Sequence, residues 1–344
     1  MLGSRLSRSL IRAYSTNRVR IVEVGPRDGL QNEKGSIPVS LKVELINRLA
    51  NAGAVNIEAG SFVSPKWVPQ MAGTADVLKQ IKKKPNVHYP VLVPNQRGLQ
   101  DLLTLLDENP SSPPLTDEIA IFTAATDAFT KANLNCTISE SLARLTSVTR
   151  HALDRGLRVR GYVSVVIACP YSGKTDYKKV REVAEELIDM GCYEVSLGET
   201  VGQGRPHEVA EMLEEVKKSV PVERLAVSFG HFHDTYGTAV ANVLTALEHG
   251  VRTIDSSVGG LGGCPYSPGA TGNVATEDVL YALQTSPHQV SGSYQGDTID
   301  LEAVSEIGWW ISEALGRESV SRVGRAIRAR KKREEEQKKL QSKL

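Results

Sequence analysis

Residues 159–197 read VRGYVSVVIACPYSGKTDYKKVREVAEELIDMGCYEVSL. An apolar run at Val159–Val166 is followed by an amphipathic stretch at Tyr177–Met190 and by a second apolar run at Tyr193–Leu197. Short apolar runs predict buried strands, while apolar side chains three and four positions apart predict one face of a helix. Gly191 follows the amphipathic stretch, where a glycine commonly ends a helix. The segment therefore predicts a strand, a helix and a second, parallel strand.

The same alternation continues in both directions along the chain. Strands are predicted at residues 19–24, 55–58, 89–93, 119–122, 159–166, 193–197, 225–229 and 253–256. Helices are predicted at residues 39–51, 70–83, 99–106, 139–155, 177–190, 207–219, 236–250 and 276–284. Eight such units predict an α/β fold, a (β/α)8 TIM barrel with extra C-terminal helices. A doubly wound open sheet is the competing architecture, but no Gly-rich dinucleotide loop follows the first strand. In TIM barrels the catalytic residues lie on the loops that follow the strands.

Charge is distributed unevenly along the 344 residues. Residues 1–20 carry a net charge of +5 and residues 317–344 a net charge of +7, which leaves −11 for residues 21–316 of a chain whose total is +1. The basic side chains thus lie in the tails, and the body is not expected to bind nucleic acid. No apolar run reaches the roughly 18 residues of a membrane span. The four cysteines form no CxxC pair and predict no disulfide framework.

Both ends resemble targeting signals. Residues 1–17 are rich in Arg and Ser and free of acids, which is typical of a mitochondrial transit peptide; a disordered basic tail is the alternative. Ser342-Lys343-Leu344 matches a peroxisomal address, so organelle import receptors are expected partners. The expected organisation is a transit peptide (1–17), the barrel (18–290), a helical addition packed on it (291–316) and a basic tail (317–344). Apart from its last three residues, the basic tail is expected to be a solvated charged segment with no binding role.

Two charged side chains follow the first predicted strand. Arg27 and Asp28 lie in a Gly/Pro-rich loop directly after it. A surface salt bridge is the simpler interpretation of the pair, and the position at the barrel mouth favours a role in chemistry. Glu58 and Glu199 end two other strands, where they are either structural or take part in proton transfer and in orienting metal ligands.

The seventh predicted strand leads into His231 and His233. Side chains two positions apart on an extended chain point the same way, so both imidazoles can reach one metal ion. The loop after the eighth strand holds six glycines in 14 residues and carries Cys264. Such a loop suits a lid with a reactive thiol, although a buried inert cysteine and a phosphate-binding loop are alternatives.

The barrel topology brings these segments together, because the seventh, eighth and first strands follow one another around the closed ring. Asp28, His231, His233 and Asn273 can then surround one cation. A set of one carboxylate, two imidazoles and one amide oxygen favours Mg²⁺ or Mn²⁺, with Zn²⁺ or Co²⁺ possible. Open coordination positions would remain for substrate oxygens.

Five motifs together carry a resemblance to a known family. They are EVGPRDGLQNE (23–33), SFVSPKWVPQM (61–71), RGYVS (160–164), GHFHDTYG (230–237) and GLGGCPYSPGATGNVATED (260–278). The chain resembles the hydroxymethylglutaryl-CoA lyase family over roughly residues 18–315. That family belongs to a wider group of metal-dependent TIM-barrel lyases and condensing enzymes.

The resemblance implies an activity and a set of roles. The activity is metal-assisted cleavage of 3-hydroxy-3-methylglutaryl-CoA to acetyl-CoA and acetoacetate, as in leucine degradation and ketone-body formation, by a mitochondrial enzyme with a possible peroxisomal pool and a homodimeric assembly. The implied metal ligands are Asp28, His231, His233 and Asn273, with Glu277 as a neighbour of the metal site. The implied catalytic residues are Arg27, which stabilises the enolate oxygen, Cys264, which protonates the carbanion from a closing loop that includes Gly262 and Gly263, and His231 and Glu58.

Two departures from the family pattern bear on these expectations. Glu199 replaces the Asp of an SLGDT run, and Ser228-Phe229-Gly230 looks inserted before the paired histidines. A condensing enzyme of the same group, a lyase for a related acyl-CoA and a catalytically silent scaffold barrel remain the alternatives.

Overall fold

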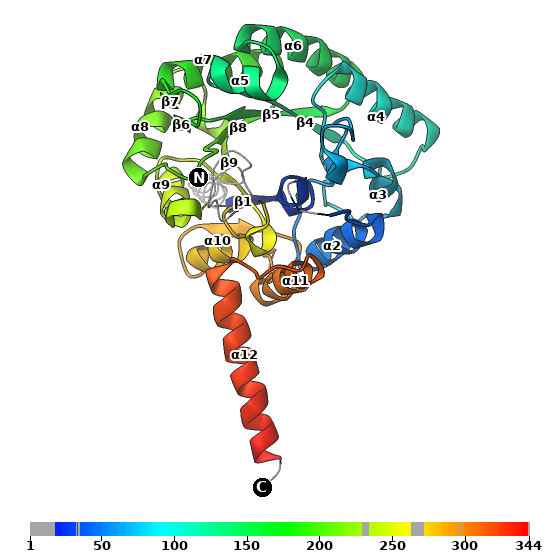
Figure 1. The fold of residues 1–344 in the computed structure, drawn as a ribbon, viewed down its shortest axis with the longest axis vertical. Coiled ribbons are helices and arrows are strands. Elements are labelled where there is room, and N and C mark those ends of the chain that lie inside the picture. The colour runs from blue at the N-terminus through cyan, green and yellow to red at the C-terminus, as the bar shows by residue number, and fades with distance from the viewer. Residues whose placement is uncertain are drawn as a thin grey trace, which may run out of the picture.

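The computed structural model describes residues 18–31, 33, 35–228, 234–262, 272–295 and 297–342. A ring of helices surrounds a central set of strands in the described part, and one long helix projects away from the ring (Figure 1). The barrel strands are β1 (Arg18–Glu23), β2 (Gly60–Ser61), β3 (Val91–Leu92), β4 (Glu118–Ala124), β5 (Arg158–Ser164), β8 (Glu194–Gly198), β9 (Leu225–Ser228) and β10 (Thr253–Ser256).

These strands pair in parallel in the order β2-β3-β4-β5-β8-β9-β10-β1. The ring closes between β1 and the residues just before β2. The Glu23 N–H donates to the Asn56 carbonyl at 2.9 Å, and the Glu58 N–H donates to the Glu23 carbonyl at 3.0 Å. The predicted (β/α)8 barrel is therefore confirmed.

The eight predicted helices are present, with shifted ends in several cases. They are α2 (Val39–Asn51), α3 (Thr74–Gln80), α4 (Gln96–Glu108), α6 (Ile138–Asp154), α7 (Tyr177–Asp189), α8 (Pro206–Val216), α9 (Ala239–Glu248) and α10 (Thr276–Leu283). α3 starts four residues later than predicted, because Pro69–Met71 forms a 3-10 turn and Gly73 adopts a φ of +80°. The strand predicted at 55–58 is likewise displaced: residues 56 and 57 form single bridges, and the regular pairing lies at Gly60–Ser61.

Further elements decorate the barrel. Their bounds are α5 (Asp127–Leu134), α11 (Leu301–Ala314), α12 (Arg322–Gln341), the hairpin β6 (Ala168–Cys169) and β7 (Gly173–Lys174), and β11 (Gln289–Ser291), which pairs with β1. Short turns are η1 (Gly25–Gly29), η2 (Pro69–Met71), η3 (Val222–Arg224), η4 (Asp234–Tyr236) and η5 (Val258–Gly260). α11 packs on η5, α2 and α10, and α12 begins against α10 and α11. Within the described residues, none of the helices combines the length and the hydrophobicity that a membrane span requires.

The barrel strands separate an apolar outer core from a polar interior. Side chains alternate across a strand, so Val159 and Val163 of β5 face the helices and are fully buried in the main hydrophobic cluster. The intervening Arg160 and Tyr162 face inward and are equally buried. TIM-barrel interiors are usually filled by branched apolar side chains, so this polar interior is a departure from the common pattern.

Candidate active site

A tight turn at the end of β1 positions the first candidate residues. Residues 25–29 were expected to form a loop, but they form one π-helical turn in which the N–H groups of Asp28 and Gly29 donate to the Val24 carbonyl at 2.8 and 3.1 Å. The Glu23 carboxylate, buried below the turn, accepts from the Gly25 N–H at 2.8 Å and from the Val258 N–H at 3.0 Å. Burial raises the pKa of Glu23 to about 7. This carboxylate therefore ties β1 to the turn η5 after β10.

Arg27 is a buried cation at the barrel mouth. Its Nε donates to Glu58 Oε2 at 2.6 Å and its Nη1 donates to Asp28 Oδ1 at 2.8 Å. Burial by itself lowers the pKa of Arg27, but the charges of Glu58 and Asp28 outweigh it and raise that pKa above its usual value. The guanidinium is thus held charged and in one orientation, with only 2% of the residue exposed.

Asp28 and Asn273 lie side by side, as the expected metal site requires. Asn273 Nδ2 donates to Asp28 Oδ2 at 2.9 Å, and both side chains are buried. Gly262 has a φ of +128°, and a Cβ there would lie 2.9 Å from Asn273 Nδ2, so a glycine is required for this close approach. A carboxylate and an amide packed together in a buried site suit a hard divalent cation. In the described ranges, no group of three or more His, Cys, Asp or Glu side chains could hold a metal by itself.

Four predicted site residues, His231, His233, Gly263 and Cys264, lie outside the described residues. The residues next to them are placed. The Asp234 N–H donates to the Gly272 carbonyl at 2.9 Å, which joins the residue after His233 to the residue before Asn273. β9 pairs with both neighbours up to Ser228. The described chain therefore resumes after the paired histidines in contact with Gly272, the residue before Asn273.

The three remaining carboxylates occupy different places. Glu58 accepts from Arg27 and, through Oε1, from the Tyr162 hydroxyl at 2.7 Å. Glu199 accepts from the Val201 and Gly202 N–H groups of its own loop at 3.1 and 2.8 Å, and burial raises its pKa to about 7. Glu277 accepts from the Gly259 N–H at 3.0 Å, and burial raises its pKa well above the usual value.

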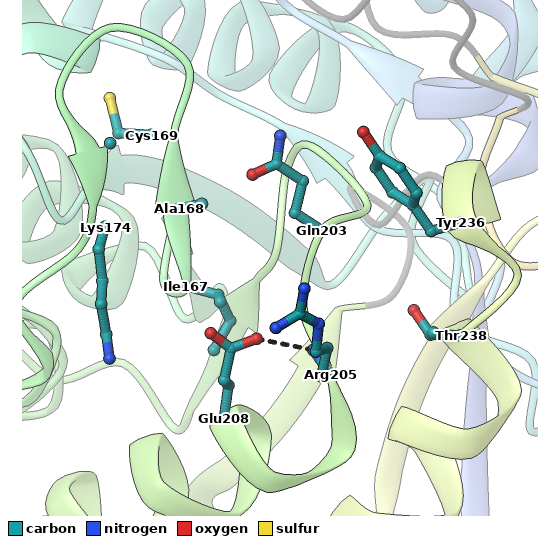
Figure 2. A pocket seen from close by; sticks show the side chains of 10 residues that line it. Ile167, Ala168, Cys169, Lys174, Gln203, Arg205, Glu208, Tyr236 and Thr238 are labelled. Atoms are coloured by element: carbon teal, nitrogen blue, oxygen red, sulfur yellow. Dashed lines mark hydrogen bonds between the residues drawn. The ribbon is translucent and has the colours of Figure 1, made fainter.

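A cavity of about 760 Å³ opens beside this cluster. Its wall includes Arg27, Asp28, Tyr162 and Thr200, and it extends past the exposed Trp67. A smaller cavity of about 400 Å³ lies beside the β6–β7 hairpin and is lined by residues such as Lys174, Gln203 and Arg205 (Figure 2). None of the predicted site residues that the structure describes lines the smaller cavity, whereas Arg27 and Asp28 line the larger one, which is therefore the candidate active site.

Sequence reasoning missed part of the site. Tyr162 lines the cavity, its hydroxyl bridges Arg160 and Glu58, and Glu23 anchors the turn that carries Arg27. The available signal was an arginine and a tyrosine two positions apart inside an otherwise apolar strand. Because strand side chains alternate, such a pair faces the barrel interior rather than the apolar outer core.

Comparison with known proteins agrees with this geometry. The HMGL-like family model matches residues 18–307. The chain is 50% identical to the hydroxymethylglutaryl-CoA lyase of Pseudomonas mevalonii over 92% of this chain and 99% of the relative, and 50% identical to the mitochondrial hydroxymethylglutaryl-CoA lyase of Bos taurus over 92% and 94%. The crystal structure of hydroxymethylglutaryl-CoA lyase from Pseudomonas aeruginosa superposes with a TM-score of 0.84 at 47% identity, covering 91% of this chain and 98% of that one. The chain therefore belongs to the HMGL-like family.

Proposed function

We propose that the protein is a lyase that cleaves 3-hydroxy-3-methylglutaryl-CoA to acetyl-CoA and acetoacetate. Relatives that carry this name share about half of its residues over nearly their full length. The observation that carries the proposal is the buried, charged Arg27 beside the Asp28–Asn273 pair at the wall of the large cavity. This arrangement suits a reaction in which negative charge develops on oxygen atoms.

The reaction is a retro-Claisen cleavage. The tertiary hydroxyl at C3 loses its proton, and the new C3 carbonyl forms as the C2–C3 bond breaks. The electron pair of that bond passes to the thioester fragment as an enolate, and a proton added at C2 completes acetyl-CoA. The other fragment leaves as acetoacetate, so atoms and charge balance.

Arg27 opposes the charge that develops on the thioester oxygen. It is preorganised for this role because Glu58 and Asp28 fix its guanidinium, and a fixed donor costs no reorganisation during the reaction. Burial strengthens the effect, because charges interact more strongly away from water.

The HMGL-like family is generally dependent on a divalent cation. Asp28, His231, His233 and Asn273 would hold it in this chain. When bound, such a cation supplies positive charge that makes a substrate hydroxyl more acidic. The ligand set favours Mg²⁺ or Mn²⁺.

Proton transfer falls to other residues in this proposal. Cys264 protonates the enolate at C2, since a thiol with an ordinary pKa of about 8.5 still carries its proton at neutral pH. His231 takes part in moving the hydroxyl proton. Glu199 accepts from the N–H groups of Val201 and Gly202, and these hydrogen bonds fix the loop that places Thr200 on the cavity wall. Burial raises the pKa of Glu199 to about 7, and in this proposal the carboxylate supports proton transfer from behind that loop.

The test is direct. The purified 344-residue chain is incubated with hydroxymethylglutaryl-CoA and Mg²⁺, and acetoacetate is quantified with and without EDTA. Cys264→Ala is assayed beside Cys192→Ala, a control that removes a buried thiol from the helix–strand connection before β8. We expect release of acetoacetate that EDTA abolishes, a loss of at least roughly 100-fold in Cys264→Ala, and retained activity in the control.

Other outcomes separate the parts of the proposal. Full activity in Cys264→Ala would leave the lyase standing and reject the cysteine as the proton donor. No cleavage with any divalent cation would reject the substrate and favour a related acyl-CoA, a condensing reaction or a silent barrel.

The two terminal signals lead to a proposal about location. We propose that residues 1–17 direct import into mitochondria and that the terminal Ser342-Lys343-Leu344 directs a second pool to peroxisomes. A fluorescent protein fused to the C-terminus should leave only the mitochondrial pool, and a fusion to the N-terminus should leave only the peroxisomal pool. An even cytosolic signal from either fusion would reject the corresponding address.

A further inference from the structure

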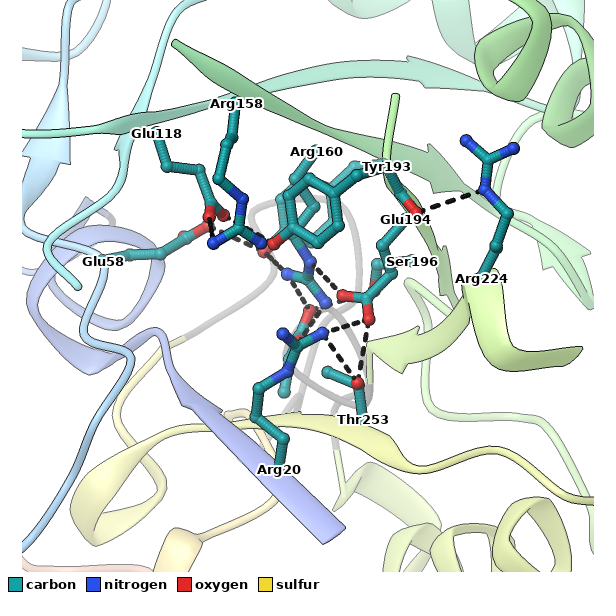
Figure 3. A network of polar contacts seen from close by, with 12 residues as sticks. Arg20, Glu58, Glu118, Arg158, Arg160, Tyr193, Glu194, Ser196, Arg224 and Thr253 are labelled. Carbon is teal, nitrogen blue, oxygen red and sulfur yellow. Dashed lines mark hydrogen bonds and ion pairs between the residues drawn. The ribbon is translucent and has the colours of Figure 1, made fainter. Parts of the chain in front are cut away.

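The barrel interior contains an arginine that the proposed chemistry does not use. Arg160 of β5 is 1% exposed and lies at the centre of a polar network (Figure 3). Its Nε donates to Glu194 Oε1 at 2.8 Å, and its Nη2 and Nη1 donate to the two oxygens of Asp255 at 2.7 and 3.1 Å. Two carboxylates from β8 and β10 thereby clamp one guanidinium.

The clamp directs a fourth N–H of Arg160 toward a tyrosine. Nη1 also donates to the Tyr162 hydroxyl oxygen at 2.6 Å. A guanidinium can only donate, so this oxygen must accept, and the single hydroxyl proton of Tyr162 is left to point elsewhere. It points to Glu58 Oε1, which lies 2.7 Å away.

Glu58 links the Tyr162 hydroxyl to the candidate catalytic arginine, Arg27. With Oε1 taken by Tyr162, its Oε2 accepts from Arg27 Nε at 2.6 Å. The Tyr162 ring also lies close to both guanidinium groups, with the Arg160 and Arg27 carbons 4.9 and 5.5 Å from its centroid. In each hydrogen bond from Arg160 to Tyr162 to Glu58, only one of the two partners can donate. The donor group of Arg160 therefore fixes where the Tyr162 hydroxyl points, and the tyrosine in turn fixes the Glu58 carboxylate that holds Arg27.

We propose that Arg160 is a positioning residue for the lyase reaction, which orients Arg27 through the Tyr162 hydroxyl and the Glu58 carboxylate. The kinetic part of this inference rests on the proposed function. The structural part, that Arg160 sets the orientation of Tyr162 and Arg27, does not.

The alternative is that Arg160 merely balances the charges of Glu194 and Asp255. A double-mutant cycle separates the two roles, because an effect routed through Tyr162 must vanish when its hydroxyl is absent. The variants are Arg160→Lys, Tyr162→Phe and the double variant. Lysine keeps the charge but cannot bind two carboxylates and a hydroxyl in the fixed directions of a guanidinium fork.

Arg20→Lys is the matched control. Arg20 pairs with the same Glu194 carboxylate and with Thr253, but it enters from the start of β1, at the opposite end of the barrel from Arg27.

We expect Arg160→Lys to lower kcat about tenfold or more with little change in KM, because misaligned Arg27 affects mainly the transition state. In the Tyr162→Phe background the same change should alter kcat less than about twofold. Arg20→Lys should leave kcat unchanged. Full kcat in Arg160→Lys, or effects that multiply in the double variant, would overturn the proposal.

A crystal structure of Arg160→Lys decides the matter independently of activity. We expect the Tyr162 hydroxyl to leave Glu58 and the Arg27 guanidinium to shift; unchanged positions of both would refute the inference even if the wild-type protein failed to cleave the proposed substrate. Should Arg160→Lys not fold, Asp255→Asn opens the same clamp with an isosteric side chain, and the same cycle with Tyr162→Phe and the same crystallographic comparison apply.

Discussion

Arg27 is the residue on which the proposed chemistry most depends. Replacement by lysine keeps one positive charge but loses the paired contacts to Glu58 and Asp28, because an ammonium cannot reproduce the guanidinium fork. We expect Arg27→Lys to lower kcat by roughly 100- to 1000-fold, the usual cost of removing a preorganised donor. Steady-state kinetics check this, with circular dichroism to confirm folding. A kcat within about threefold of wild type would show that the fork is not needed.

Glu23 should make the stability of the protein depend on pH. Burial raises its pKa from 4.5 to about 7. Between these two pH values the folded state therefore keeps a proton that the unfolded chain has released. This contribution to stability is complete below about pH 4.5 and is lost as the pH rises through 7. A protonated Glu23 can donate to the Thr276 hydroxyl, which lies 2.7 Å from Oε2.

A glutamine at position 23 mimics the protonated form. It keeps an oxygen for the two backbone N–H groups and offers an N–H to Thr276. We therefore expect the melting temperature of Glu23→Gln, measured relative to that of wild type, to increase as the pH rises from 5 to 8. Parallel pH profiles for the two proteins would show that Glu23 titrates as an ordinary carboxyl.

Among the elements, those with strong periodicity were predictable from the sequence and those with local irregularity were not. The strands and helices of the barrel repeat regularly, and Gly191 follows its helix with a positive φ, as Gly53 and Gly250 do after two others. α5 was missed because it is short and depends on local contacts: the Thr126 side chain caps it, and Asn135 ends it with a φ of +50°. The π-helical turn of η1 follows from the buried Glu23 carboxylate, a tertiary contact that no periodicity reveals.

The residues of the candidate site likewise include some whose positions were predictable from the sequence and some whose contacts were not. Arg27, Asp28 and Asn273 were predicted because topology alone brings the ends of adjacent strands together. The precise use of Glu58, Glu199 and Glu277 was not predictable, because a carboxylate at a strand end can face a substrate or its own backbone. Only the hydrogen-bond partners of each one distinguish these possibilities.

α11 supports the turn η5 through a glycine in its middle. A Cβ at Gly308 would lie 2.2 Å from Glu277 Oε1, the atom that accepts from the Gly259 N–H. We expect Gly308→Ala to lower the free energy of unfolding by about 2 kcal/mol through overpacking, despite the better helix propensity of alanine. Urea denaturation measures this. Glu306→Ala, on the exposed side of the same helix, should change it by less than about 0.5 kcal/mol, and equal effects of the two changes would contradict the packing argument.

At the scale of the whole molecule, α12 combines a docked start with a projecting end. Ser321 Oγ and the Val323 N–H both donate to Asp278 Oδ1 at 2.8 Å, and Arg322 pairs with Asp234. Residues 332–342 are exposed throughout. We expect truncation after Lys331 to shift the melting temperature by less than about 2 °C, and truncation after Gly316 to lower it by roughly 5–10 °C. Differential scanning calorimetry checks both, and similar losses in the two truncations would mean that the projecting end also stabilises the barrel.

Because the polar contacts inside the barrel join residues from several strands, the functional site is assembled only when the barrel closes correctly. Arg160 finds its partners only when β5, β8 and β10 are all in place, and Tyr162 reaches Glu58 only when the segment before β2 has joined the ring. A slip of β5 by one residue would turn both side chains toward the helices and bring Val159 and Val163 inside. Such a chain would bury several unpaired charges, so it is selected against by its own free energy. Misregistered barrels are thus rejected during folding, and each molecule that completes the ring already holds Arg27 in its working orientation.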